Sequence, residues 1–353
     1  MRYEQIACEK ARALRESGHA RILAIESSCD ETAAAIIEDG RIIRSSVIAT
    51  QIDTHALYGG VVPEIASRMH VEALDPLLDQ ALAQAGMTAD QIDAVGVTYG
   101  PGLVGALLTG LSWAKAFAYA RRLPLVPVNH IEGHVSANYL SHPDLEPPFV
   151  CLVASGGHSH IIEVLDYTHF KVIGRTRDDA AGEAFDKAAR AMGYPYPGGV
   201  AIDKAAQRGN PKTYPLPHPR VDGSPYDFSF SGLKTAVLNT LNHAAQKGEE
   251  INRDDLCASF QQTVCDLIAG KLMLAAEATG HKKIVFAGGV SANSGLRARL
   301  TDECKKCGYS FYVPPLELCG DNGAMVGAQG YYEFMAGNLA GLDLNAVASL
   351  SIE

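Results

Sequence analysis

The stretch ILAIESSCDETAAAIIEDGRIIRSSVIA, residues 22–49, contains the pattern that decides the fold. Three largely apolar segments within it, at 22–26, 32–38 and 41–49, have the length and composition of strands. Asp39-Gly40, between the second and third segments, is a strong signal for a two-residue hairpin turn. The stretch therefore predicts a meander of three strands with a polar, tight first turn.

The same plan recurs later in the chain. A second meander is predicted at 149–154, 160–165 and 170–176. Later in each half come a strand, a glycine turn, a helix and a second strand. In the first half the strand is 92–98, the turn 100–102, the helix runs on to Arg121, and the second strand is 125–128. In the second half the same elements are 283–287, 288–289, 293–307 and 309–313. Such a duplication is the layout of the α/β ATPase fold of the actin–hexokinase–Hsp70 type, in which two RNase H-like lobes flank a central nucleotide cleft.

The pattern also predicts the domain boundaries. Residues 1–20 form a helical extension, and 21–134 with about 323–345 form the first actin-like lobe. The second lobe covers 135–322 and includes a proline-rich surface loop at 208–227.

Composition limits the classes of function. The net charge of −10 argues against a protein that holds nucleic acid by bulk electrostatics, so an RNA partner would need a local basic patch or a helper subunit. Eight scattered cysteines, including Cys304 and Cys307 at an expected helix end, indicate reduced thiols and a cytoplasmic protein. The uncharged run 94–114 is broken by Gly100-Pro101-Gly102, which favours a strand, turn and helix over a membrane span.

Two histidines follow the strand at 125–128. Asn129 is a good N-cap, and His130 and His134 would then lie on one face of a helix. Because a helix N-terminus disfavours imidazolium, both rings should be neutral, the form that binds a metal. The alternative is a pair of buried histidines satisfied by hydrogen bonds. Glu132 lies about 200° around the helix from His130, so the sequence does not match the zinc-protease motif.

Asp321 follows the closing strand of the second half, at the position equivalent to the histidines. Strand ends of open α/β sheets face the ligand crevice, so its carboxylate should meet the imidazoles across the cleft. Two histidines and one aspartate leave open coordination positions, as a catalytic metal requires. Asp321 is alternatively the N-cap of the helix that begins near Asn322.

Several turns are candidates for binding a nucleotide. Ser155-Gly156-Gly157 allows backbone N–H groups to approach an anion closely. Asp186 and Asp203 could accept hydrogen bonds from ribose hydroxyls, or cap helices instead. The turn 287–293 follows an apolar strand and opens a helix, as expected for an adenosine shelf.

Seven motifs together resemble one family, the tRNA adenosine threonylcarbamoyltransferases of the bacterial TsaD type, once called O-sialoglycoprotein endopeptidases. They are ESSCDET at 26–32, NHIEGH at 129–134, SGGH at 155–158, FDK at 185–187, FSFSGLK at 228–234, AGGVSAN at 287–293 and CGDN at 319–322. The resemblance runs from about Arg21 to near Gly337. The sequence departs from the family pattern at Gly320 and at Ser159-His160, none of them a ligand position.

The resemblance implies transfer of a threonylcarbamoyl group from threonylcarbamoyl-adenylate to the N6 amine of the adenosine 3′ of the anticodon in ANN-decoding tRNAs. It implies one divalent metal, with Fe2+ favoured over Zn2+, held by His130, His134 and Asp321. It also implies an adenylate site formed by Val153, Ala154, Ser155, Gly156, Gly157, Asp186, Gly199, Asp203 and Asn293. Alternative functions on the same fold are a small-molecule kinase, a metalloprotease and a catalytically inactive scaffold.

The resemblance further implies partners, namely a paralogous actin-fold subunit of the TsaB type and a small ATPase of the TsaE type. We expect the chain to form a heterodimer through its first lobe, or a homodimer when the partner is absent. Small residues of the helix 104–120 would allow the partner's helix to approach, and they are Gly105, Ala106, Gly110, Ala114 and Ala118. The alternative is that this helix is buried within its own lobe.

Overall fold

The structure is a computed structural model that describes residues 3–219 and 221–352. These residues form two compact units. The first contains the described residues up to Pro147, Leu165–His169 and those from Pro314 onward, and the second contains Pro148–Val164 and Phe170–Val313. Residues 135–147 and 314–322 thus pack with the first unit, whereas the sequence pattern placed them in the second lobe.

The first unit contains a five-stranded sheet in the order β3-β2-β1-β4-β5. Its strands are β1 (Arg21–Glu26), β2 (Glu31–Glu38), β3 (Ile42–Thr50), β4 (Ala94–Gly100) and β5 (Leu125–Asn129). β1, β2 and β3 pair antiparallel, and β4 and β5 run parallel to β1. The β2–β3 turn is formed by Asp39 and Gly40, both at positive φ, as the hairpin signal requires.

Helices cover both faces of this sheet. Its six α-helices within the described residues are α1 (Tyr3–Ser17), α2 (Ile52–Ala56), α3 (Pro63–Ala85), α4 (Val104–Arg121), α5 (His130–Ser136) and α11 (Gly323–Ala336). Side chains of β1 alternate between the two faces. Ile22 belongs to the core cluster under α11, and Leu23 to the cluster under α3 and α4. Both faces are buried, so β1 is apolar from Ile22 to Ile25, between Arg21 at its start and the buried Glu26 at its end.

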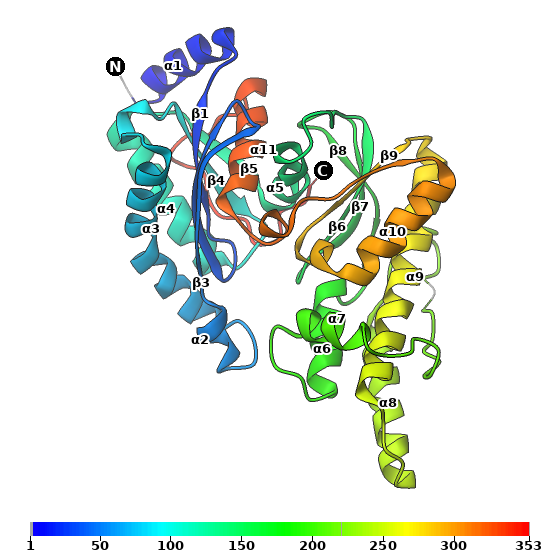
Figure 1. Cartoon of the computed structure of the whole chain (residues 1–353). Helices are drawn as coiled ribbons and strands as arrows, with labels where there is room; N and C mark the ends of the chain where they lie inside the picture. Colours follow the sequence, from blue (N-terminus) through cyan, green and yellow to red (C-terminus); the bar gives the residue numbers. More distant parts are fainter. Residues whose placement is uncertain (1–2, 220, 353) are drawn as a thin grey trace. The chain divides into compact units, whose positions relative to one another are not determined.

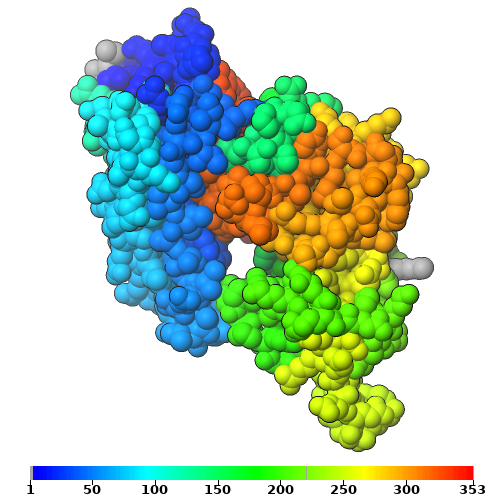
Figure 2. All heavy atoms as spheres, in the orientation of Figure 1, coloured from blue at the N-terminus to red at the C-terminus, as the bar shows by residue number. Residues whose placement is uncertain are grey.

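The second unit repeats this arrangement, which confirms the predicted duplication. Its strands are β6 (Phe149–Ala154), β7 (Ser159–Val164), β8 (Phe170–Arg175), β9 (Lys283–Ala287) and β10 (Ser310–Tyr312), in the order β10-β9-β6-β7-β8. Its α-helices are α6 (Ala181–Ala191), α7 (Gly198–Ala206), α8 (Ser231–Lys247), α9 (Arg253–Thr279) and α10 (Ser294–Cys307). One end of α8 protrudes from this unit, as Figures 1 and 2 show.

Short 3-10 turns complete the chain, at Ala89–Gln91, Ala137–Leu140, Gly289–Ala292 and Leu316–Leu318. The expected N-terminal helix is present as α1, and the uncharged run 94–114 is divided between β4 and α4. Among the described residues, every helix is too short or too polar to cross a membrane. Cys304 is buried and Cys307 exposed in the last turn of α10, and both are free thiols.

The prediction that the small residues of α4 form a docking face is wrong. Ala106, Gly110 and Ala114 are buried inside their own unit. A Cβ atom at Gly110 would collide with the Ser27 hydroxyl, so the glycine is needed for α4 to lie close to the end of β1. The exposed large hydrophobic residues of this helix are instead Val104, Leu108 and Tyr119.

Candidate metal and nucleotide sites

Helix α5 begins directly after β5, and Asn129 determines where it starts. The Asn129 side-chain oxygen accepts a hydrogen bond from the Ile131 N–H at 2.9 Å, as predicted for an N-cap. His130 and His134 therefore lie one turn apart, with ring centroids 4.7 Å from each other. Both are buried, with exposed fractions of 5% and 0%.

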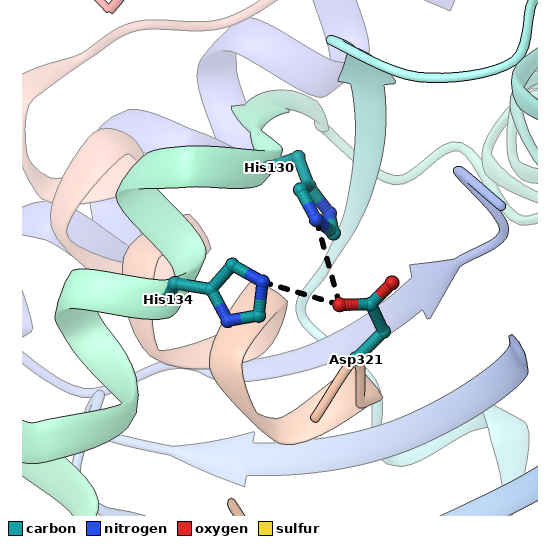
Figure 3. A group of neighbouring side chains, drawn as sticks. All are labelled: His130, His134 and Asp321. Carbon is teal, nitrogen blue, oxygen red and sulfur yellow. Dashed lines mark ion pairs between the residues drawn. The ribbon is translucent and has the colours of Figure 1, made fainter. Parts of the chain in front are cut away.

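Asp321 completes the group, as Figure 3 shows. Its Oδ1 atom lies 3.1 Å from His134 Nε2 and 3.5 Å from His130 Nε2. The cap of α11 is Asn322, whose side-chain oxygen accepts from the Met325 N–H, so Asp321 is not needed as a cap. Asp321 and both histidines belong to the first unit, rather than facing one another from different lobes.

These three residues could hold a metal ion. They each offer one ligand atom, and the three atoms lie within 4.8 Å of one another. His134 is fully buried, and neither ring nitrogen makes a hydrogen bond of good geometry, although Nε2 lies 3.1 Å from Asp321 Oδ1. A metal bound by both atoms would partly relieve this costly arrangement. Ligand atoms bound at about 2.1 Å to one ion lie about 3.0–3.4 Å apart, close to the spacings around Asp321 Oδ1. The residues present therefore fit a metal.

Glu26 orients His130, a role that the sequence did not reveal. Its carboxylate is fully buried and lies 3.1 Å from His130 Nδ1. It also accepts hydrogen bonds from the Thr98 hydroxyl at 2.7 Å and the Ser28 N–H at 2.5 Å. With Nδ1 directed at Glu26, His130 presents Nε2 to Asp321, the carboxylate–histidine arrangement that tunes metal ligands. The available signal was a carboxylate at the end of an otherwise apolar strand.

The electrostatics of His130 differ from the neutral ring expected there. Burial lowers the pKa of His130, but the carboxylates of Asp321 and Glu26 outweigh burial and raise it to about 9. Burial raises the pKa of Glu26, and the His130 ring more than offsets this, so that the pKa lies below its usual value. The helix N-terminus is thus a weaker influence on His130 than the two carboxylates.

Neither Ser28 nor Glu132 is placed as the nucleophile or the general base of a hydrolytic site. Ser28 Oγ lies 3.1 Å from His130 Nδ1, but Ser28 is only 1% exposed and cannot reach a substrate. Glu132 faces Glu333 on α11; burial and then this second carboxylate raise the pKa of Glu132 to about 9. The charged group that acts on Glu132 is thus on α11, as expected for a glutamate that points away from the histidines.

Two glycine turns lie side by side in the second unit. Val153 pairs with Ala287 in the parallel register of β6 and β9, so the turns after these strands are neighbours. Gly288 has a φ of +86° and packs against Ala154, where any Cβ would collide with backbone. Gly156 and Gly157 are exposed, and a Cβ built at either meets no atom within 4 Å.

The remaining residues predicted for the adenylate site lie at the starts of α7 and α10 or contact them. Asp186 accepts a hydrogen bond from Gly198 N at 2.7 Å and stabilises the N-terminus of α7, where Gly199 follows. Asp203 accepts from Ser294 N and Oγ at the start of α10. Asn293 caps α10 through Leu296 N. The polar side chains thus serve as caps here, and their contact with ribose stays a prediction.

Comparison with known proteins identifies relatives over nearly the whole chain. The model of the TsaD family, described as tRNA N6-adenosine threonylcarbamoyltransferase, matches residues 42–328. A protein of that name from Clostridium botulinum (strain 657 / Type Ba4) is 54% identical over 331 residues, 94% of this chain and 97% of its own length. One from Clostridioides difficile (strain 630) is 53% identical over 330 residues, 94% of this chain and 98% of its own.

Solved structures with the same fold are more distant in sequence. The (R)-2-hydroxyglutaryl-CoA dehydratase component A of Acidaminococcus fermentans matches with a TM-score of 0.53 and 16% identity, covering 90% of this chain and 99% of its own. Full-length HypF, in a phosphate- and nucleotide-bound form, matches with a TM-score of 0.59 and 16% identity, covering 90% of this chain and 46% of its own. At this identity the matches establish the actin-like ATPase fold alone.

Proposed function

Because the chain belongs to the TsaD family of tRNA N6-adenosine threonylcarbamoyltransferases, we propose that it transfers the threonylcarbamoyl group of threonylcarbamoyl-adenylate to tRNA. The acceptor is the N6 amine of the adenosine 3′ of the anticodon in ANN-decoding tRNAs. The observation that carries the proposal is 54% identity over 94% of the chain, together with the buried group of His130, His134 and Asp321.

The reaction needs little covalent chemistry from the protein. The N6 nitrogen forms a bond to the carbamoyl carbon, the bond from that carbon to the phosphate oxygen breaks, AMP leaves, and the amine loses a proton. The mixed anhydride is already activated, so the protein must chiefly orient the two reactants. A divalent ion, for which we favour Fe2+ over Zn2+, would supply a Lewis acid for phosphate or carbonyl oxygens.

Residues of each unit have separate roles in this proposal. In the first unit, His130, His134 and Asp321 hold the ion, and Glu26 fixes the ring of His130. In the second, the turn at residues 153–157 binds the adenylate, because Gly156 and Gly157 leave open space beside their backbone. Asp186, Gly199, Asp203 and Asn293 complete that site around the two glycine turns.

Charge is distributed unevenly between the two units. The acidic excess lies in the first unit, whereas Lys and Arg slightly outnumber Asp and Glu in the second. Phosphate contacts dominate affinity for RNA, so we propose that the second unit provides most of the attraction for tRNA. The net negative charge of the whole chain weakens its attraction for tRNA, which supports a dependence on helper subunits. In this proposal the reaction takes place in the cytoplasm.

The partner surface in this proposal lies on α3 and α4. A groove there is lined by Val71, Leu74, Leu108, Thr109, Ser112 and Trp113. Val71 is 67% and Leu108 41% exposed, an unusual exposure for aliphatic residues on neighbouring helices. A related actin-fold subunit would present the equivalent pair of helices, and a small ATPase would join the pair. A second copy of this chain would occupy the groove when that subunit is absent.

Size-exclusion chromatography with light scattering tests this surface. Leu108→Glu places a charge in the groove and should abolish the dimer or the complex with the related subunit. Leu238→Glu is the control, because Leu238 is a similarly exposed leucine on α8 of the second unit. Unchanged assembly of Leu108→Glu would place the partner elsewhere.

Mass spectrometry of nucleosides tests the function itself. tRNA is incubated with threonylcarbamoyl-adenylate and the chain, with and without the two partner proteins. We expect N6-threonylcarbamoyladenosine in the complete mixture, equal amounts of AMP, and little product from the chain alone. Phosphorylation of a small molecule or cleavage of a protein, without modified tRNA, would instead establish one of the alternative functions.

A further inference from the structure

Residues 338–352, here called the C-terminal strap, follow α11 and run beside β5, an edge strand of the first sheet. Near its start, Ala340 N donates to Leu125 O at 2.9 Å, at the beginning of β5. Farther along, Val347 N donates to Tyr99 O at 2.8 Å and Ala348 O accepts from Gly102 N at 3.1 Å. The strap thus passes from one end of β5 to the end where the metal ligands lie.

The strap ends at the residue that starts the metal-binding helix. The Asn129 side-chain nitrogen donates a hydrogen bond to the Ser351 carbonyl at 2.9 Å. The oxygen of the same amide caps α5 by accepting from Ile131 N. Asn129 is 4% exposed, and Ile352, the next residue of the strap, is 6% exposed. One buried amide therefore joins the strap to the helix that carries both histidines.

We propose that the C-terminal strap is a positioning element for the metal site and acts through Asn129. The Ser351 carbonyl can only accept, so it holds the amide with its nitrogen toward the strap and its oxygen toward Ile131. This fixes the first turn of α5, in which His130 is the first residue. The strap lies beyond residues 42–328, which the family model matches. The inference rests on the proposed function, in that a metal binds at His130 and His134.

Replacing Asn129 with serine should keep one of the two hydrogen bonds that its amide makes and remove the other. Serine is as good an N-cap as asparagine but is too short to reach the strap and keep the cap at once. Asn129→Ser should therefore preserve α5 while removing the link to Ser351. Ending the chain after Leu350 removes the same link from the other side, together with the buried Ile352 side chain. Ser349→Ala is the control within the strap, because Ser349 is exposed.

Titration with Co2+ tests the proposal, since its visible absorption reports both affinity and ligand geometry. We expect Asn129→Ser and the truncation each to lower Co2+ affinity about tenfold, the low end for groups that support metal ligands, and to alter the absorption band. The doubly changed protein should bind no more weakly than the weaker single variant, because both changes remove one link. Ser349→Ala should match the wild type.

The possible results of this experiment decide between the proposals. Co2+ binding within twofold of wild type in Asn129→Ser would overturn the positioning role, and so would additive losses in the double variant. If the truncated chain does not fold, Asn129→Ser alone decides the question. Absence of both Co2+ binding and tRNA modification in the wild type would contradict the proposed function instead.

Discussion

Replacing Glu26 with glutamine tests how the protein prepares its metal ligands. The substitution keeps the shape of the side chain and removes one buried negative charge. The carboxylate lies 3.1 Å from His130 Nδ1 and accepts two further hydrogen bonds, from Thr98 and Ser28. Glutamine cannot satisfy all three contacts, because only its oxygen accepts. His130 then becomes a less basic and less well oriented ligand.

The magnitude follows from these contacts. Loss of an outer partner of a metal-bound histidine typically costs about 10–100-fold in metal affinity, or about 1.4–2.7 kcal/mol. Folding stability of the metal-free chain should fall as well, because His130 holds the buried carboxylate in its charged form and loss of one partner of a buried pair is destabilising. The metal affinity is therefore compared under conditions in which circular dichroism shows that the variant is folded.

Competition with a chromophoric chelator measures Zn2+ affinity, and urea unfolding of the metal-free protein measures stability. Glu163→Gln is the matched control, because Glu163 also pairs with a histidine, His281, at 3.0 Å, but in the second unit. The control should bind Zn2+ like the wild type. Equal Zn2+ affinity in Glu26→Gln and wild type would refute the assignment of Glu26 as the residue that orients His130.

Other predictions concern the remaining parts of the sites. Elemental analysis should find about one equivalent of metal in the wild type and none in His134→Ala. Unchanged metal content would move the site elsewhere. Gly156→Val should abolish most AMP binding in calorimetry. Its circular dichroism should stay native, because a Cβ at this position meets no protein atom. Gly270→Val on α9 is the control and should not change AMP binding. Burial lowers the pKa of His70 below 6.5 in the folded chain. The unfolded chain therefore binds a proton at His70 more readily than the folded chain. The stability that the neutral ring contributes above pH 6.5 is lost as the pH falls. Urea unfolding at about pH 5.5 and about pH 7.5 should show a smaller pH effect in His70→Gln than in wild type.

The sequence predicted elements with strong local signals. The two meanders, the hairpin at Asp39-Gly40 and the cap at Asn129 are all present in the structure. Each depends on residues close together in the chain, where turn geometry or strand length leaves few alternatives. The spacing of His130 and His134 likewise predicted a shared helix face, since it depends on helical periodicity alone.

Features set by tertiary packing were not predictable in this way. Glu26 meets His130 through contacts between residues 104 positions apart, which no local pattern encodes. The small residues of α4 suit an interface and a buried helix equally well, and only the position of Ser27 shows that they face inward. Asp321 was placed in the other lobe because the pattern shows where a strand ends but not which unit the following turn packs against.

Transfer to tRNA by a chain changed only at Asp321 tests the account most directly. With both partner proteins, threonylcarbamoyl-adenylate and an ANN-decoding tRNA, a single-turnover time course is followed by nucleoside mass spectrometry. The account predicts that Asp321→Asn forms N6-threonylcarbamoyladenosine at least about a hundredfold more slowly than wild type, because a neutral amide is a poor metal ligand. Asp166→Asn, an exposed aspartate of the same unit, should retain the wild-type rate. Equal rates for Asp321→Asn and wild type would contradict a metal-assisted transfer at this site.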